Sequence, residues 1–154
     1  MTSAPSTRTK VFISYSHADK AWLERLKRHL KPVVREGRLD YWADTHIRPG
    51  DDWKQEIRAA LDTAQVAVLL ISADFFASDF IDENEIPPIL TAAQAKGVRI
   101  LPVILSTSRF ARHPDLVRFQ AVNSPNQPLD KMSRAEQEEV FDRLAQIVEN
   151  ALNP

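Results

Sequence analysis

Residues 65–72 read QVAVLLIS and residues 98–105 read VRILPVIL, and these two nearly unbroken apolar runs indicate the fold class. Strands that carry so few polar side chains are typical of a parallel sheet that is covered on both faces. The two runs therefore predict central strands of a sheet that lies between two layers of helices.

The segments on either side of these runs alternate between strand and helix patterns. Shorter apolar or aromatic stretches predict strands at KVFISYS (10–16) and RLDYWAD (38–44), and VRFQAV (117–122) is a further candidate for a short strand. Helical spacing of apolar residues predicts helices over 17–34, 52–64, 86–96 and 133–152. Ser133 and Glu136 have the spacing of a capping box at the start of the last helix, and Gly97 is a suitable helix stop.

This alternation predicts an α/β fold of three layers with a central parallel sheet. Right-handed crossovers leave few topologies, and we expect a flavodoxin-like, five-stranded sheet in the order 2-1-3-4-5. One domain should span residues 10–152, preceded by a flexible arm over residues 1–9.

Composition excludes several classes of function. The 154 residues carry a formal net charge of −1, so there is no basic excess to suggest binding to nucleic acid or to an anionic membrane. The absence of cysteine excludes Cys-ligated zinc and Cys nucleophiles and fits a cytoplasmic location, and the four histidines show no metal-ligand spacing. No apolar run approaches the ~20 residues of a membrane span. The three glycines cannot form a G-x-G-x-x-G fingerprint or a P-loop.

In the expected strand order, the direction of the sheet reverses between the first and third strands, and ligands bind beyond the carboxyl ends of the strands at such a point. The stretch SDFIDENEIPPIL (78–90) follows the third strand and carries Asp82, Glu83 and Glu85. Acidic residues at the start of a helix commonly serve only as caps or dipole partners. Glu85 lies closest to the apolar stripe of the following helix, so we expect it at the lip of this crevice.

Three stretches, in this order, resemble the boxes of the bacterial TIR (Toll/interleukin-1 receptor) domain. KVFISYSHADKAW resembles the first box, YWADTHIRPGDDWKQEI resembles the second strand and BB loop, and VAVLLISADFFASDFIDENEI resembles the third strand and the glutamate-bearing helix. FQAVN followed by QPL is similar to the last strand region, so the resemblance extends from about residue 10 to residue 151.

The resemblance implies one of two roles. Some TIR domains are adaptors that associate with other TIR domains, whereas others cleave NAD⁺ at the nicotinamide–ribose bond and release ADP-ribose or a cyclic form of it. In the enzymatic group the catalytic glutamate lies four residues after an aromatic or apolar residue that follows a serine. Ser78, Ile81 and Glu85 match that spacing, with Ile81 where tryptophan is common and Phe80 beside it. Glu83 is the second choice for the catalytic acid.

The resemblance also implies further site residues, with NAD⁺ as substrate and no cofactor or metal. Those expected to contact NAD⁺ are Ser14, Tyr15, Trp42, Asp44, Arg48, Ser72, Phe80 and Ile81. Those expected at a BB-loop interface with another TIR domain are His46, Ile47, Pro49 and Gly50. Trp42 stands at a strand end, where core packing and ligand contact are equally reasonable. An NAD⁺ glycohydrolase that is active on assembly is the first hypothesis, an adaptor is the second, and a receptor that binds an ADP-ribose-like signal without cleaving it is the third.

Overall fold

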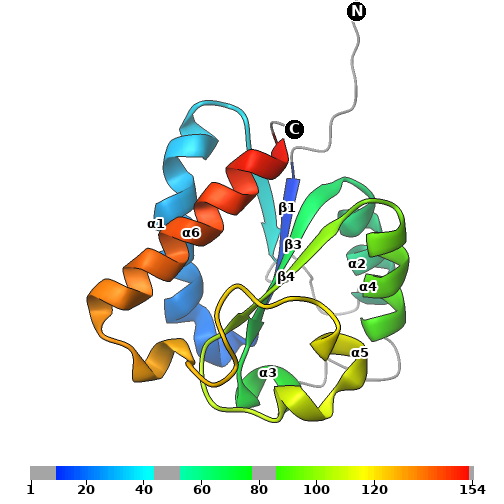
Figure 1. The fold of residues 1–154 in the computed structure, drawn as a ribbon. Helices are drawn as coiled ribbons and strands as arrows, with labels where there is room; N and C mark the ends of the chain where they lie inside the picture. Colours follow the sequence, from blue (N-terminus) through cyan, green and yellow to red (C-terminus); the bar gives the residue numbers. More distant parts are fainter. Residues whose placement is uncertain (1–9, 44–52, 78–85, 153–154) are drawn as a thin grey trace, which may run out of the picture.

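The computed structural model describes residues 10–43, 53–77 and 86–152. They form a parallel sheet with the helices α1 and α6 on one face and α2 and α4 on the other (Figure 1). The predicted three-layer α/β architecture is therefore confirmed.

The sheet of the described residues has four strands in the order β2-β1-β3-β4. Their bounds are Lys10–Ser14 for β1, Asp40–Ala43 for β2, Ala64–Ile71 for β3 and Arg99–Ile104 for β4. All three pairings are parallel, and the carboxyl end of β1 is level with β3 where Ser14 pairs with Leu69. This order agrees with the predicted 2-1-3-4 succession.

Strand β3 is buried on both of its faces, as its apolar run predicts. Val66, Val68 and Leu70 belong to the core beneath α1 and α6. The alternate residues Ala67, Leu69 and Ile71 belong to the core beneath α2 and α4. Because side chains alternate across a strand, this arrangement requires a helical layer on each side of β3.

The four predicted helices are all present. They are α1 (Lys20–Arg35), α2 (Trp53–Asp62), α4 (Ile86–Ala95) and α6 (Arg134–Leu152), and the shorter helices are α3 (Ala73–Ala77) and α5 (Pro114–Val117). The described residues also contain the single 3₁₀ turns η1 (His17–Asp19), η3 (Phe110–Arg112) and η4 (Leu129–Lys131). Gly97 follows α4 with a φ of 99°, a left-handed conformation that glycine adopts without strain, as expected of a helix stop. Among the helices described, none is both long and apolar enough to span a bilayer.

Helix α6 begins with the predicted capping box. The Ser133 N–H donates to Glu136 Oε1 at 2.9 Å, and the Glu136 N–H donates to Ser133 Oγ at 3.2 Å. Hydrogen bonds from Ser133 to the Glu136 carboxyl, chiefly the one from the Ser133 backbone N–H, lower the pKa of that carboxyl. The helix is also linked to α1, because Arg25 and His29 both contact the Glu138 carboxylate, at 2.5 and 3.0 Å.

The predicted strand over residues 117–122 is absent, and this part of the prediction was wrong. Residues 118–123 form turns and bends after α5. Only one backbone bond follows a strand-like path there, from the Val122 N–H to the Pro102 carbonyl at 2.8 Å. Pro102 has no N–H to return, which weakens the outer edge of β4 as a partner for another strand.

The side chain of Asn123 occupies the place of that strand at the edge of β4. Its Oδ1 accepts from the Ile104 N–H at 2.9 Å, and its Nδ2 donates to the Ile104 carbonyl at 3.0 Å and to the Gln127 carbonyl at 2.9 Å. Asn123 is buried, so these bonds satisfy backbone groups that would otherwise lack partners.

Replacement of Asn123 by alanine should lower the free energy of unfolding by about 2–3 kcal/mol, because it leaves buried backbone groups of Ile104 without partners. Urea denaturation followed by circular dichroism measures this change. Asn126→Ala, at an exposed position of the same loop, is the matched control and should stay within about 0.5 kcal/mol of the parent. Equal stability of the two variants would contradict the bridging role of Asn123.

Candidate active site at the carboxyl edge of strands β1 and β3

The strand order reverses between β1 and β3, as predicted for the crevice. β1 is followed by Tyr15, Ser16 and the η1 turn, and β3 is followed by Ser72 and α3. Since β1 and β3 are parallel, these two connections leave the sheet at the same edge. In Figure 1 this is the lower edge of the sheet, where α3 lies.

Three of the residues expected to contact a ligand lie at this edge, with their side chains below the surface. Ser14 is 4% exposed, and Tyr15 and Ser72 are each 2% exposed. The Tyr15 ring lies against the His17 imidazole, with 5.8 Å between ring centroids. These side chains therefore lie beneath the surface at the carboxyl edge of β1 and β3.

Ser16 and Asp19 both stand close to the start of α1, and they have different hydrogen-bond partners. Ser16 Oγ accepts from the Ala18 N–H at 3.2 Å, so Ser16 caps the η1 turn. Asp19 stands at the N-cap position of α1 but makes no capping hydrogen bond. Its carboxylate instead accepts from Ser72 Oγ, with 2.5 Å between Oγ and Oδ2.

The hydrogen bond between Ser72 and Asp19 joins the two connections that form the edge. Asp19 is only 8% exposed, and Ser72 Oγ in turn accepts from the Phe75 N–H at 3.0 Å. Burial raises the pKa of the Asp19 carboxyl above its usual value of 3.8, the bond from Ser72 lowers that pKa, and the nearby Asp74 carboxylate raises it. The sequence shows that Asp19 is a polar residue shortly after β1. It does not show that the partner of Asp19 is Ser72, which lies 53 residues further along the chain.

Helix α3 is an element that periodicity did not predict, because its five residues are too few to show a helical pattern. Its Phe75 is fully buried, and Phe76 stacks on the His113 imidazole with 4.0 Å between centroids and an interplanar angle of 3°. The helix is thereby held against both β3 and the η3–α5 region.

The remaining predicted site residues lie outside the described part of the chain. For Trp42 the backbone belongs to β2, but its side chain is not among those described. The other residues concerned are Asp44, His46, Ile47, Arg48, Pro49, Gly50, Phe80, Ile81, Glu83 and Glu85. Their assignments remain predictions. The described residues on either side of the glutamates are Ala77, the last residue of α3, and Ile86, the first residue of α4.

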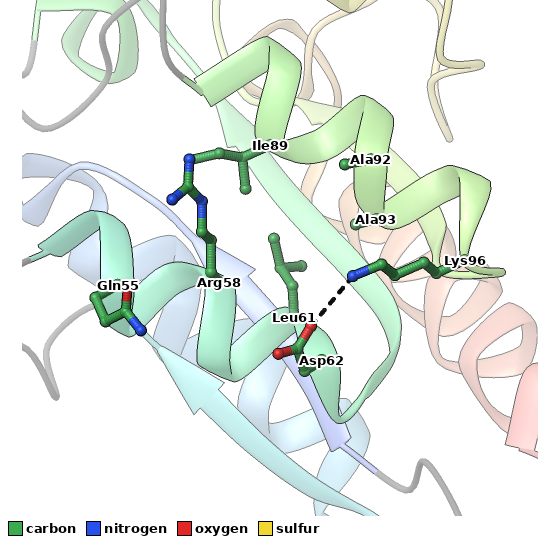
Figure 2. Close-up of a pocket in the computed structure, with 8 residues that line it drawn as sticks. All are labelled: Gln55, Arg58, Leu61, Asp62, Ile89, Ala92, Ala93 and Lys96. Carbon is green, nitrogen blue, oxygen red and sulfur yellow. Dashed lines mark ion pairs between the residues drawn. The ribbon is translucent and has the colours of Figure 1, made fainter.

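A separate pocket of about 290 Å³ lies between α2 and α4 (Figure 2). Leu61, Ile89 and Ala93 supply its apolar surface, and the Lys96 ammonium lies 3.8 Å from the Asp62 carboxylate at one end. Asp62 and Lys96 stand at the ends of their helices, and helices that connect parallel strands end at the edge opposite the crevice. Within the described residues, no cluster of three or more His, Asp or Glu side chains could hold a metal ion.

Comparison with known proteins supports the fold and identifies the family. A Sinorhizobium fredii (strain NBRC 101917 / NGR234) protein, "Uncharacterized protein y4lF", is 29% identical over 141 residues, which cover 92% of this chain and 43% of that protein. The chain thus spans less than half the length of this relative.

Two solved structures have the same fold. The TIR domain of the Toll-related receptor TRR-2 from Hydra magnipapillata has a TM-score of 0.52 at 18% identity, covering 91% of this chain and 98% of that one. The structure of the RPS4 and RRS1 TIR domain heterodimer has a TM-score of 0.52 at 16% identity, and the match covers 92% of this chain and 97% of that one.

A family model described as "TIR domain" matches residues 11–145, which is most of the chain. This match agrees with the parallel sheet in the order β2-β1-β3-β4. The chain belongs to the TIR domain family.

Proposed function

We propose that this TIR domain is an NAD⁺ glycohydrolase that cleaves the nicotinamide–ribose bond, with Glu85 as the catalytic carboxylate. The single observation that carries the proposal is the strand order β2-β1-β3-β4 in a chain of the TIR family. In this order α4 connects β3 to the parallel strand β4, so its first residue, Ile86, begins at the carboxyl edge. Glu85 immediately precedes that residue in the chain.

One carboxylate is sufficient for this chemistry. The nicotinamide of NAD⁺ already carries a positive charge, so it leaves as a neutral base without needing a proton from a general acid. As its bond to C1′ of the ribose breaks, the ribose develops oxocarbenium character, as in glycoside hydrolysis. A carboxylate close to that ribose stabilises the positive charge in the transition state. Water then attacks C1′ and loses a proton, which gives ADP-ribose, whereas attack by a group of the ADP-ribose itself gives a cyclic product.

The remaining substrate contacts are part of the same proposal. Aromatic faces from Trp42 and Phe80 would hold the nicotinamide ring, and Arg48 would reach the diphosphate. Three of the residues expected to contact NAD⁺ are buried at the carboxyl edge, namely Ser14, Tyr15 and Ser72. They can bind NAD⁺ only if the substrate enters below the surface of the protein.

We propose that catalysis depends on self-assembly, in which the BB loop of one copy, including His46, Ile47, Pro49 and Gly50, completes the crevice of another. Association between TIR domains is the subject of the RPS4–RRS1 heterodimer structure. The cytoplasm, where NAD⁺ is available, is the proposed location, and bacterial immune defence or signalling is the proposed setting. The longer Sinorhizobium relative supports a further proposal, that such a domain works as one module of a larger protein.

Glu85→Gln should reduce the rate of nicotinamide release from NAD⁺ by about 100-fold or more, because the amide cannot stabilise the developing cation. Glu83→Gln is the matched control, since it removes an equal charge two positions earlier, and it should retain most of the activity. Product formation is followed by chromatography with the purified domain at high concentration. Loss of activity in Glu83→Gln alone would transfer the catalytic role to Glu83.

Substitution of the BB loop separates the enzyme from the adaptor. Pro49→Ala should weaken self-association, and NAD⁺ cleavage should fall in parallel and recover at higher protein concentration, because the loop acts through assembly. Analytical ultracentrifugation and the NAD⁺ assay are carried out on the same samples. A parent protein that associates through this loop but leaves NAD⁺ intact would favour the adaptor, and binding of ADP-ribose without product would favour a receptor.

A further inference from the structure

The buried carboxylate of Asp19 is not explained by the fold around it. It occupies the N-cap position of α1 without capping that helix, and among the described residues no lysine or arginine forms an ion pair with it. A buried carboxylate without a cationic partner costs free energy relative to a neutral group. The side chain is therefore poorly suited to stability alone.

The Asp19 carboxylate contacts the start of α3. Ser72 Oγ donates to Asp19 Oδ2 at 2.5 Å and accepts from the Phe75 N–H at 3.0 Å. The hydroxyl has one proton, and its donation to Asp19 fixes the direction in which the oxygen lone pairs face the Phe75 N–H. The bond thus orients the first turn of α3, which makes the backbone of α3 depend on a residue of the β1–α1 connection.

The position of α3 matters because this helix leads directly into the acidic segment. α3 ends at Ala77 and α4 begins at Ile86, so residues 78–85 connect two helices that are fixed in the structure. The other described anchors of α3 are apolar or aromatic, namely the buried Phe75 and the stacked Phe76. The hydrogen bonds of Ser72 are directional, and they fix the end of the helix that adjoins β3.

We propose that Asp19 is a positioning residue, which acts through Ser72 to hold the start of α3 at the carboxyl edge between β1 and β3. This inference rests on the proposed NAD⁺ cleavage for its consequence, but the link between Asp19 and α3 can be measured without any catalysis.

The activity arm uses three variants and a double variant. Asp19→Ala and Ser72→Ala should each lower kcat for NAD⁺ cleavage about tenfold or more with little change in KM, because small displacements of a catalytic group are costly. The double variant should be no worse than the poorer single variant, since both act through one bond. Asp19→Asn keeps an acceptor oxygen for the Ser72 hydroxyl and should rescue kcat to within about threefold of the parent.

Asp74→Asn is the matched control for this arm. Asp74 is exposed in the first turn of α3, and its carboxylate is the neighbouring charge that raises the pKa of Asp19. Removing its charge leaves the hydrogen bond between Ser72 and Asp19 in place, so kcat at pH 7 should stay at the parent value. Additive losses in the double variant, or a full kcat in Asp19→Ala, would overturn the positioning role.

The second arm is amide hydrogen exchange measured by NMR in the absence of NAD⁺. Asp19→Ala should accelerate exchange of the Phe75 amide about tenfold or more, because opening of α3 becomes easier, while amides in the middle of α6 remain as in the parent. Asp19→Asn should leave Phe75 protected. If the parent protein has no activity on NAD⁺ but this pattern appears, the proposed function fails and the link to α3 stands. Unchanged Phe75 protection in Asp19→Ala overturns the link whatever the activity.

The pH dependence of stability provides a third measurement. The raised pKa of Asp19 in the folded protein means that the folded state holds this proton more tightly than the unfolded state. Stability from this group is therefore present below the ordinary value of 3.8 and declines as pH rises through the raised pKa. Besides burial, the groups that act on the carboxylate are the Ser72 hydroxyl after β3, which lowers its pKa, and Asp74 on α3, which raises it.

Asp19→Asn cannot ionise, so its urea midpoint relative to the parent should rise as the pH increases above 3.8, because the parent loses the contribution of this proton. Asp74→Asn should move this rise to lower pH, because removal of the neighbouring carboxylate lowers the pKa of Asp19. A difference between Asp19→Asn and the parent that is constant from about pH 3 to pH 7 would show that the carboxylate does not experience the buried environment on which the inference depends.

Discussion

The burial of strand β3 on both faces is the constraint on which the rest of the structure depends. Val66, Val68 and Leu70 face one core, and Ala67, Leu69 and Ile71 face the other. A strand of this kind is stable only between two helical layers, and right-handed crossovers then place the start of each connecting helix at the carboxyl edge. The reversal of strand order between β1 and β3 then brings the connections after these two strands together at this edge.

At this edge a buried carboxylate, that of Asp19, takes the place of a helix cap. The fold has local means of capping helices, as Ser133 and Glu136 show at the start of α6. At α1 the equivalent position carries Asp19, whose carboxylate is turned away from its own helix toward Ser72. Burial of a carboxyl with a raised pKa is an energetic cost that a simple cap would avoid. Such costs are typical of sites where the position of a polar group matters more than its contribution to folding.

The proposed enzyme and its two alternatives, an adaptor and a receptor for an ADP-ribose-like signal, all depend on the scaffold of the TIR family. For the enzyme, the chemistry requires little from the protein: an anionic group close to a ribose and a leaving group that is already cationic. The proposed chemistry therefore needs neither a cysteine nucleophile nor a glycine-rich phosphate loop, and the chain has no cysteine and only three glycines. Placement of one side chain then becomes the main task of the fold, and the polar contacts at the edge are suited to that task.

Local sequence patterns were sufficient to predict the order of the four strands and the four longer helices, the two-sided burial of β3, the capping box of α6 and the stop at Gly97, but they did not predict α3. Each of these depends on the spacing of residues within a few positions, so it can be derived from local periodicity and backbone preferences. Two contacts became visible in the packed chain alone. The Asp19 carboxylate accepts a hydrogen bond from Ser72, 53 residues away, and the Asn123 side chain bonds to the backbone of Ile104, where a fifth strand was expected. Local pattern does not reveal these pairings, because a polar side chain can bond with many partners and only the packed chain determines which one lies within reach.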